Sequence, residues 1–225
     1  MGKGRLIIIE AGDGSGKATQ TKMLYEHLCR DGYKVRQVSF PDYESDSSAL
    51  VKMYLGGSFG THATDVNAYA ASVFFAVDRY ASFMMKWKAA YEAGEIILAD
   101  RYTTSNMVHQ AVKMEDEKKR DAFLAWLWDF EFRKLGLPVP DLVVFLNMAP
   151  EVSDMLLAKR ADSKHQGKDI HEADKKYLHR CHQAYVELSK KYGWETVTCS
   201  QNHLPRSRES IHQDVYALTA KILQK

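Results

Sequence analysis

Five short apolar runs alternate along the chain with longer segments that carry apolar residues at helical spacing. The runs are almost continuously hydrophobic, which is typical of strands covered on both faces in a parallel sheet. Helical segments between parallel strands indicate an α/β fold. We therefore predict a five-stranded parallel sheet flanked by helices, with strands at residues 5–10, 34–40, 95–99, 141–147 and 195–199.

The longest predicted helix covers residues 64–93. At about 100° per residue its apolar positions form one stripe, which we expect to face the core. Phe75 and Arg79 fall on roughly the opposite side, one turn apart. A nucleobase stacked on Phe75 and hydrogen-bonded by Arg79 would satisfy both side chains, and packing of Phe75 under a loop or in a subunit interface is the alternative. The stripe consists of Val66, Tyr69, Ala70, Val73, Phe74, Val77, Tyr80, Ala81 and Met84.

Composition is consistent with one domain spanning residues 1–225, because 45% of the residues are hydrophobic and no linker-like stretch divides the chain. The 31 basic and 29 acidic residues are well mixed, so we expect small-molecule partners rather than nucleic acid or a membrane. Three cysteines without metal-like spacing, no signal peptide and no long apolar run predict a cytoplasmic protein.

A glycine-rich turn, EAGDGSGKATQ at residues 10–20, directly follows the first predicted strand. Such a turn gathers backbone N–H groups at a helix N-terminus, where Lys17 can reach the terminal phosphates of a nucleoside triphosphate. Ala11 and Ala18 depart from the strict phosphate-loop pattern, which has Gly and Ser or Thr there, so an ordinary glycine turn is the alternative. The predicted triphosphate-binding residues are Gly12, Asp13, Gly14, Ser15, Gly16, Lys17, Ala18 and Thr19.

Asp100 and Arg101 follow the third predicted strand, at the edge where ligands bind in parallel sheets. The carboxylate can hold Mg²⁺ through water or orient the attacking oxygen, and the planar guanidinium suits two phosphate oxygens. An Asp-Arg pair is by itself more often a surface ion pair. Because this chain also carries a phosphate loop, the position of the Asp100–Arg101 pair favours a role in nucleotide binding.

The polar segment KRADSKHQGKDIHE, residues 159–172, predicts a short mobile lid that brings basic groups over the transferring phosphates. Arg160, Lys164 and Lys168 are the candidates, and Arg160 is the one assigned to catalysis. A solvated charged face is the alternative for each of them.

Five segments together resemble the thymidylate kinase family. They are EAGDGSGKATQ, the Phe40-Pro41 pair, VFFAVDRY at 73–80, DRYTTSNMVHQ at 100–110 and PDLVVFL at 140–146, and they occur in the family's order. The resemblance implies a P-loop NTPase fold and a homodimer. It also implies transfer of the ATP γ-phosphate to dTMP with Mg²⁺ as the metal.

The resemblance also implies roles for individual residues. Asp13 is expected to contact the acceptor sugar, Phe75 to stack on thymine and Arg79 to read the base. Arg101 is expected to hold the acceptor phosphate, and Asp100 to serve the metal or the attacking oxygen. The other acceptor-binding candidates are Phe40, Pro41, Ser105, His109 and Gln110, and the catalytic candidates are Lys17, Asp100, Arg101 and Arg160.

Several positions depart from the family pattern. Asp42 and Tyr43 stand where the family often has an arginine near the acceptor phosphate, and His109 stands where it has an aromatic residue beside the deoxyribose. Ile170 replaces an arginine of the lid, and Ala18 lacks the hydroxyl that normally contacts Mg²⁺.

Two other functions remain open. A deoxynucleoside kinase would need a carboxylate base near the sugar, for which Asp42 or Glu44 is available. A nucleotide-binding regulatory protein that has lost efficient catalysis would explain the departures at Ala11, Ala18, Tyr43 and Ile170.

Overall fold

The computed structural model of the chain describes residues 3–161, 170–171 and 174–224, and for residues 160 and 161 it describes the backbone alone. Most of the predicted lid therefore lies outside the described residues. The same holds for Lys164, Lys168 and the side chain of Arg160.

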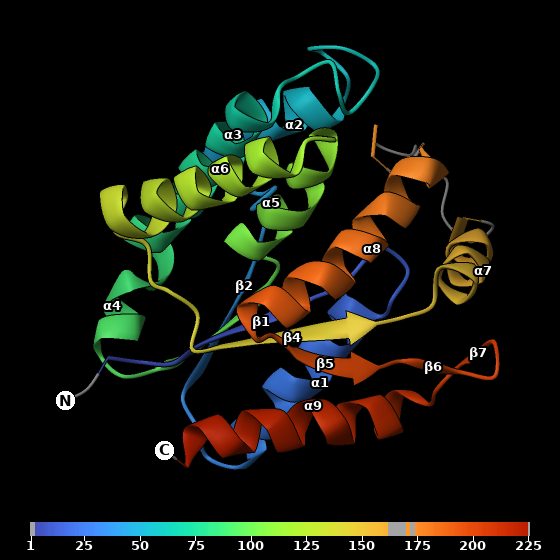
Figure 1. Cartoon of the computed structure of the whole chain (residues 1–225). Helices are drawn as coiled ribbons and strands as arrows, with labels where there is room; N and C mark the ends of the chain where they lie inside the picture. The colour runs from blue at the N-terminus through green and yellow to red at the C-terminus, as the bar shows by residue number, and fades with distance from the viewer. Residues whose placement is uncertain (1–2, 162–169, 172–173, 225) are drawn as a thin grey trace.

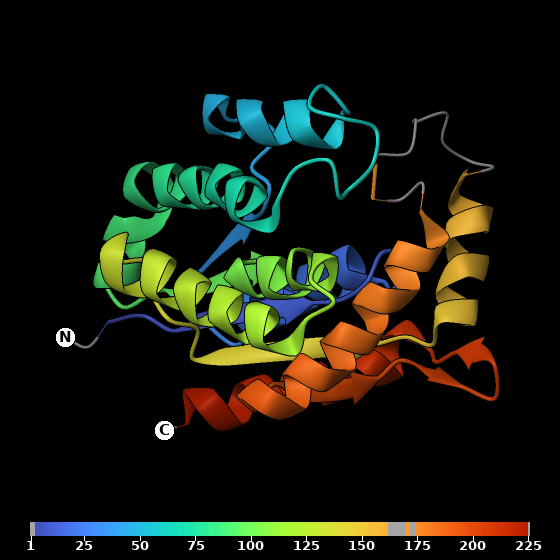
Figure 2. The same ribbon diagram turned by 45° about the horizontal axis from the view of Figure 1, so that its top comes forward.

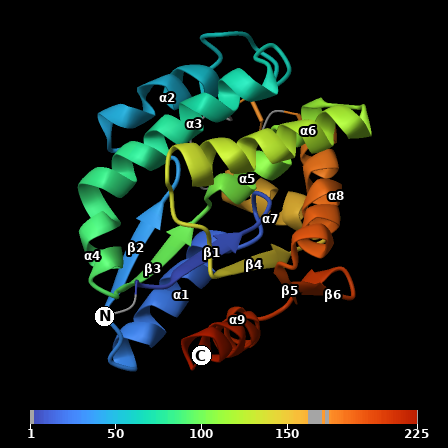
Figure 3. The same cartoon turned by 60° about the vertical axis from the view of Figure 1, so that its left-hand side comes forward.

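Five parallel strands form the central sheet, in the order β2-β3-β1-β4-β5 (Figure 1). The predicted parallel sheet and its five strands are confirmed. Figure 3 shows the strands side by side, with β1 at the centre. The strands are β1 (Leu6–Glu10), β2 (Val35–Ser39), β3 (Ile96–Asp100), β4 (Leu142–Asn147) and β5 (Glu195–Thr198).

Helices cover both faces of this sheet. Alternate side chains of the central strand β1 point to opposite faces, and because the first four of them are apolar and buried, each face needs a layer of helices. Leu6 and Ile8 pack toward α3, α5, α6 and α8, whereas Ile7 and Ile9 pack toward α1 and α9 (Figures 1 and 2). These helices are α1 (Lys17–Arg30), α3 (Ala68–Ser82), α5 (Thr103–His109), α6 (Glu117–Trp128), α8 (Lys175–Tyr192) and α9 (Arg208–Leu223).

Shorter elements connect these layers. The helix α7 (Pro150–Ala161) follows the carboxyl end of β4. Within the described ranges, none of the helices combines the length and apolar character needed to cross a membrane. The others are η1 (Asp46–Ser48), α2 (Ala49–Leu55), α4 (Lys88–Glu92), η3 (Ala111–Lys113), the π-helical turns η2 (Phe83–Trp87) and η4 (Asp129–Lys134), and the hairpin of β6 (Ser200–Gln201) and β7 (Leu204–Pro205).

The strand β2 is less buried than its sequence suggests. Strands β1 and β3 are buried along almost their whole length, but Arg36, Gln37 and Ser39 of β2 are exposed. The reason is position, because β2 lies at the edge of the sheet and has only β3 as a neighbour. The expectation that every strand is covered on both faces is therefore wrong for β2, and also for β5 at the other edge, where three of four residues are exposed.

The orientation predicted for the long helix is also wrong. A continuous helical stretch does run through α3, η2 and α4, but Tyr69, Val77, Tyr80 and Met84 of the apolar stripe are exposed by 41%, 45%, 39% and 45%. The buried face instead carries small and polar residues: Ala68, Ala71, Ser72, Ala76, Asp78, Arg79 and Ser82. Periodicity separated the two faces correctly, and the neighbouring elements decided which one is buried.

Candidate functional site

The phosphate loop joins the carboxyl end of β1 to the first turn of α1. Gly14 and Gly16 adopt φ values of 76° and 80°, which side chains rarely tolerate. A Cβ atom at Gly14 would also lie only 2.7 Å from Leu157 Cγ and 2.9 Å from the Ser153 carbonyl oxygen. Residues 12–16 thus form a tight turn, and 17–19 begin the helix, as the phosphate-loop prediction requires.

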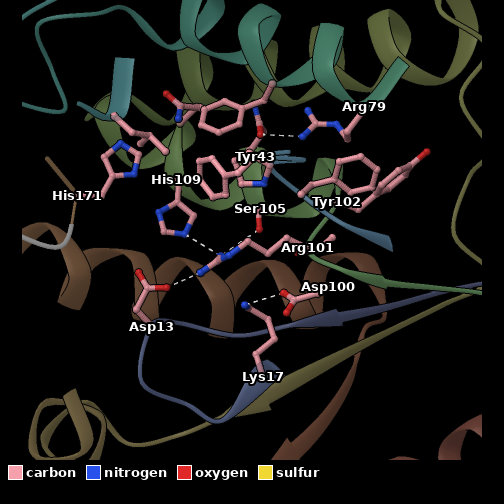
Figure 4. Close-up of a pocket in the computed structure, with 17 residues that line it drawn as sticks. Asp13, Lys17, Tyr43, Arg79, Asp100, Arg101, Tyr102, Ser105, His109 and His171 are labelled. Atoms are coloured by element: carbon pink, nitrogen blue, oxygen red, sulfur yellow. Dashed lines mark hydrogen bonds and ion pairs between the residues drawn. The ribbon is translucent and has the colours of Figure 1, made fainter. Parts of the chain in front are cut away.

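Lys17 begins α1, after the phosphate loop that follows β1, and Asp100 ends the neighbouring strand β3. The two side chains form an ion pair, with Lys17 Nζ 2.7 Å from Asp100 Oδ1 (Figure 4). Both side chains are largely buried. Burial and the nearby Arg101 guanidinium lower the pKa of Lys17, and Asp100 opposes this shift. The pair places one cation and one carboxylate beside the phosphate loop.

Arg101 contacts Asp13 of the phosphate loop, with 2.5 Å between Arg101 Nη2 and Asp13 Oδ1. The same guanidinium donates to Ser105 Oγ at 3.2 Å and to the Tyr185 hydroxyl at 3.3 Å. Burial opposes ionisation of Asp13, but the cations Arg101 and Lys17 lower its pKa overall. The Arg101 backbone has φ 66°, a left-handed conformation that costs a non-glycine residue roughly 1–2 kcal/mol. This backbone directs the side chain across the end of the sheet.

Glu10 is a fully buried carboxylate that the sequence analysis missed. It accepts hydrogen bonds from the Tyr102 backbone N–H, Thr104 Oγ1, Ser105 Oγ and the Tyr185 hydroxyl, at 2.5 to 3.2 Å. Two of these groups, Ser105 and Tyr185, also accept from Arg101. Glu10 therefore fixes Ser105 and Tyr185, the two side chains that accept hydrogen bonds from Arg101. The available signal was a charged residue ending the apolar run LIIIE.

A cavity of about 250 Å³ opens above the ends of β1, β2 and β3, and it brings together all nine predicted acceptor-binding residues. Figure 4 shows Lys17 and Asp100 at one end of the cavity, Arg79 at the other, and Asp13 and Arg101 between them. Residues that the prediction did not include also line it: Ser39, Tyr43, Leu55, Tyr102, Asn106 and His171. The predicted acceptor set is Asp13, Phe40, Pro41, Phe75, Arg79, Arg101, Ser105, His109 and Gln110.

The far end of the cavity contains an aromatic ring and a buried cation. Phe75 is half-buried and meets the Tyr54 ring edge-on, with the ring centres 6.1 Å apart. Arg79 is fully buried and forms a two-pronged ion pair with Glu131, which the sequence analysis also missed. Phe75 and Arg79 thus share one face of α3, as predicted, although that face is the inward one.

His109 and His171 form one side wall of the cavity. Their rings stack nearly parallel, with centres 5.6 Å apart. His171 Nε2 also lies 2.9 Å from the Tyr54 hydroxyl, and the Ile170 backbone N–H donates to the Leu55 carbonyl. Burial, together with Arg101, lowers the pKa of His109 well below its usual range, and burial, together with Lys113, lowers that of His171 to about 4. Both rings are therefore neutral at neutral pH.

Asp100 is a carboxylate beside the phosphate loop with the chemistry of a Mg²⁺ ligand. Within the ranges that the structure describes, no group of three or more His, Cys, Asp or Glu side chains is placed to hold a metal ion. Mg²⁺ at phosphate-transfer sites needs only one or two carboxylates, because phosphate oxygens and water complete its shell. Asp100 beside the phosphate loop fits this donor set, and Ala18 adds no oxygen to it.

The family model, the relatives and the solved structure that this chain resembles are all described as thymidylate kinases. The family model described as thymidylate kinase matches residues 9–211. The thymidylate kinase of Mycobacterium tuberculosis is 31% identical over 191 residues, which cover 84% of this chain and 87% of the relative. The human thymidylate kinase is 26% identical, with 96% and 90% covered. The solved structure of the Candida albicans thymidylate kinase shares the fold, with a TM-score of 0.71 at 21% identity over 98% of this chain and 93% of that chain.

Proposed function

Because the chain belongs to the thymidylate kinase family, we propose that it transfers the γ-phosphate of ATP to dTMP, giving ADP and dTDP. The observation that carries this proposal is the position of Arg101. Its guanidinium lies between the phosphate loop, through Asp13, and the cavity that ends at Phe75 and Arg79. A nucleoside monophosphate with its base at Arg79 would therefore have its phosphate directed toward Lys17 and the donor.

The donor side depends on the phosphate loop. Its backbone N–H groups and the helix α1 dipole favour the negative charge of ATP, and Lys17 neutralises the transferring phosphoryl group. Lys17 exchanges its contact with Asp100 for the phosphate oxygens when ATP binds. Asp100 would hold Mg²⁺, which would supply further neutralisation of phosphate charge when bound.

The acceptor side depends on shape and on fixed charges. Phe75 offers a flat surface for a pyrimidine, Arg79 hydrogen-bonds its edge, and Arg101 holds the 5′-phosphate. Asp13 fixes Arg101 and contacts the sugar. Since phosphoryl transfer needs little covalent chemistry from the protein, positioning and charge neutralisation supply the catalysis.

Neither carboxylate considered as the base of a deoxynucleoside kinase, Asp42 or Glu44, is placed for that role. Asp42 forms an ion pair with Lys86, and Glu44 is exposed. Neither residue lines the cavity. An uncharged hydroxyl would also leave Arg101 without the anion that its position favours. The observations therefore favour a phosphorylated acceptor.

We also propose that the protein acts as a homodimer. An exposed apolar stripe runs along α3 and η2 and comprises Tyr69, Val77, Tyr80 and Met84; the adjacent Met85 is 80% exposed. A second copy packed on this face would remove the apolar surface from water. A two-fold axis suits this face, because the apolar stripe of one copy then packs against the same stripe of the second copy.

A cytoplasmic location is part of the proposal. All three cysteines are free, and Cys181 and Cys199 are buried, which suits a reducing compartment.

An ADP-release assay with ATP tests the function directly. Acceptors offered one at a time are dTMP, dUMP, dCMP, dAMP, dGMP and thymidine. We expect dTMP to give the highest kcat/KM and thymidine to give no turnover. Thymidine turnover above that of dTMP would instead support a deoxynucleoside kinase, and nucleotide binding without any turnover would support the regulatory alternative.

A further inference from the structure

The buried ion pair between Arg79 and Glu131 lies behind the far wall of the acceptor cavity. Arg79 Nε donates to Glu131 Oε2 at 2.8 Å, and Nη2 donates to Oε1 at 2.5 Å. Thr103 Oγ1 donates to the same carboxylate at 2.6 Å. Glu131 is fully buried and does not line the cavity, whereas Arg79 does. The carboxylate therefore acts on the cavity only through Arg79.

The ion pair also orients a neighbouring amide. Arg79 Nη1 donates to Asn106 Oδ1 at 3.3 Å. This bond fixes the orientation of the amide, so that Asn106 Oδ1 faces Arg79 and Asn106 Nδ2 does not. Asn106 Nδ2 and Gln110 Oε1 are buried in the cavity wall, and neither has a hydrogen-bond partner among the described residues. Buried polar atoms of this kind normally have a partner. A bound ligand with matching groups would supply it.

Arg79, Asn106 and Gln110 all line the cavity, so this wall contains N–H donors of Arg79 and Asn106 and one acceptor of Gln110. A pyrimidine that carries a ring carbonyl next to a ring N–H matches this pattern. Cytosine presents an amino group in place of that carbonyl, so it would place N–H donors against Arg79, which has donors only.

We infer that Glu131 is a positioning residue for base recognition: its carboxylate fixes the Arg79 guanidinium so that the wall favours a 4-oxo pyrimidine over cytosine. Two parallel hydrogen bonds fix the plane of the guanidinium as well as its place. The third nitrogen is then available to orient Asn106. This inference rests on the proposed function, because it assigns a specificity determinant within the same acceptor site.

The test compares Glu131→Gln with Leu127→Ala. The glutamine keeps the size of Glu131, but its NH₂ group faces an Arg79 donor, so one of the two parallel bonds is lost and Arg79 turns. Leu127 is a fully buried residue of α6, one turn earlier, and its truncation lowers stability without touching Arg79. For each protein we would measure melting temperature, kcat and KM for dTMP, dCMP and ATP, and dTMP affinity by calorimetry.

In Glu131→Gln, we expect the dTMP KM and dissociation constant to rise at least about tenfold and the ratio of kcat/KM for dTMP over dCMP to fall at least about fivefold. The ATP KM should stay within about twofold of wild type. Leu127→Ala should lower the melting temperature while it leaves both the dTMP KM and the base ratio unchanged. Equal dTMP KM and base ratio in wild type and Glu131→Gln, or the same changes in both variants, would overturn the positioning role.

Thr103→Val provides a second test that does not depend on the folding of Glu131→Gln. It keeps the ion pair and removes only the hydroxyl that holds the carboxylate, so we expect a two- to fivefold rise in dTMP KM with ATP KM unchanged. No change in dTMP KM would count against the role of Glu131. Wild-type turnover of dTMP separates the two proposals. Its absence refutes the proposed function, but calorimetry can still compare the dTMP affinities of wild type and Glu131→Gln and so test the role of Glu131. A wild-type protein that neither binds nor phosphorylates dTMP overturns both.

Discussion

Asp13 and Arg101 connect the two halves of the site, with 2.5 Å between their charged atoms. Asp13 belongs to the phosphate loop after β1, and Arg101 follows β3, the strand that pairs with β1 in parallel. The register places Ile9 beside Asp100, so the residues that follow both strands meet at one edge of the sheet. This contact joins the phosphate loop to the residue that follows β3.

The first prediction concerns Lys17→Ala. We expect turnover to fall at least about a hundredfold, because the transition state loses a charge that neutralises the transferring phosphoryl group. Steady-state kinetics with dTMP and ATP measure it. Lys22→Ala, also on α1 but exposed and ion-paired with Glu26, is the control and should keep wild-type turnover. Full activity in Lys17→Ala would show that the phosphate loop has another function.

The second prediction concerns the hydroxyl missing at Ala18. The position is exposed at the start of α1, so a larger side chain fits. We expect Ala18→Thr to reach half-maximal activity at lower Mg²⁺ than wild type, because the hydroxyl adds an oxygen ligand. Ala18→Val, which has the same shape without the oxygen, should need as much Mg²⁺ as wild type. Superimposable Mg²⁺ titrations for the Thr and Val variants would exclude a metal contact at this position.

A third prediction separates base stacking from packing at Phe75. We expect Phe75→Ala to weaken dTMP binding by about 1 to 3 kcal/mol, the range found for aromatic stacking on bases, with a modest fall in melting temperature. Phe74 is the matched control, because it packs against Tyr54 and Phe59 but does not line the cavity. Phe74→Ala should lower stability and leave dTMP affinity intact. The opposite pattern in the two variants would place Phe75 in the core.

Arg79→Ala should behave differently from Phe75→Ala, although both residues lie on one face of α3. Removal of Arg79 leaves the Glu131 carboxylate buried without its partner, which typically costs about 3 to 5 kcal/mol of stability. We therefore expect a large fall in the denaturation midpoint together with weaker dTMP binding. Arg79→Ala with wild-type stability would show that the ion pair contributes nothing net to the fold.

A pH prediction follows from His171, whose pKa falls from 6.5 to about 4 on folding because burial disfavours its charged form. Between these values the unfolded state binds a proton that the native state does not, so stability decreases as pH falls from about 6.5 to about 4. At about 1.4 kcal/mol per pKa unit the loss is about 3.5 kcal/mol. Urea unfolding at several pH values should show a shallower dependence for His171→Gln than for wild type. The exposed His62→Gln is the control, and identical slopes in all three proteins would contradict the assignment.

The final prediction tests the homodimer. We expect Val77→Glu to shift the protein toward monomer in sedimentation equilibrium, because the charge would be buried against its two-fold mate. Lys22→Glu on the opposite side of the sheet should leave the oligomeric state of the wild type unchanged. A wild-type protein that sediments as a monomer would refute the proposed dimer.

The sequence determined the local framework of this protein. The apolar runs predicted all five strands because β-strand pattern is a local property, and the glycines at 14 and 16 predicted a turn that only such residues can form. The predicted acceptor residues converge on one cavity because parallel strands deliver their carboxyl ends to one edge, and the family resemblance supplied the rest of the set.

Only the tertiary structure decided which surfaces and charges meet. The periodicity of α3 defined two faces, but burial of the face that carries Arg79 depends on α2 and α5, which lie elsewhere in the chain. In the sequence, Glu10 is the last residue of a predicted strand, and no pattern singles out Glu131. They became the supports of Arg101 and Arg79 because a buried carboxylate needs partners, and those partners lie 28 to 175 residues away. A one-dimensional pattern carries no information on such contacts.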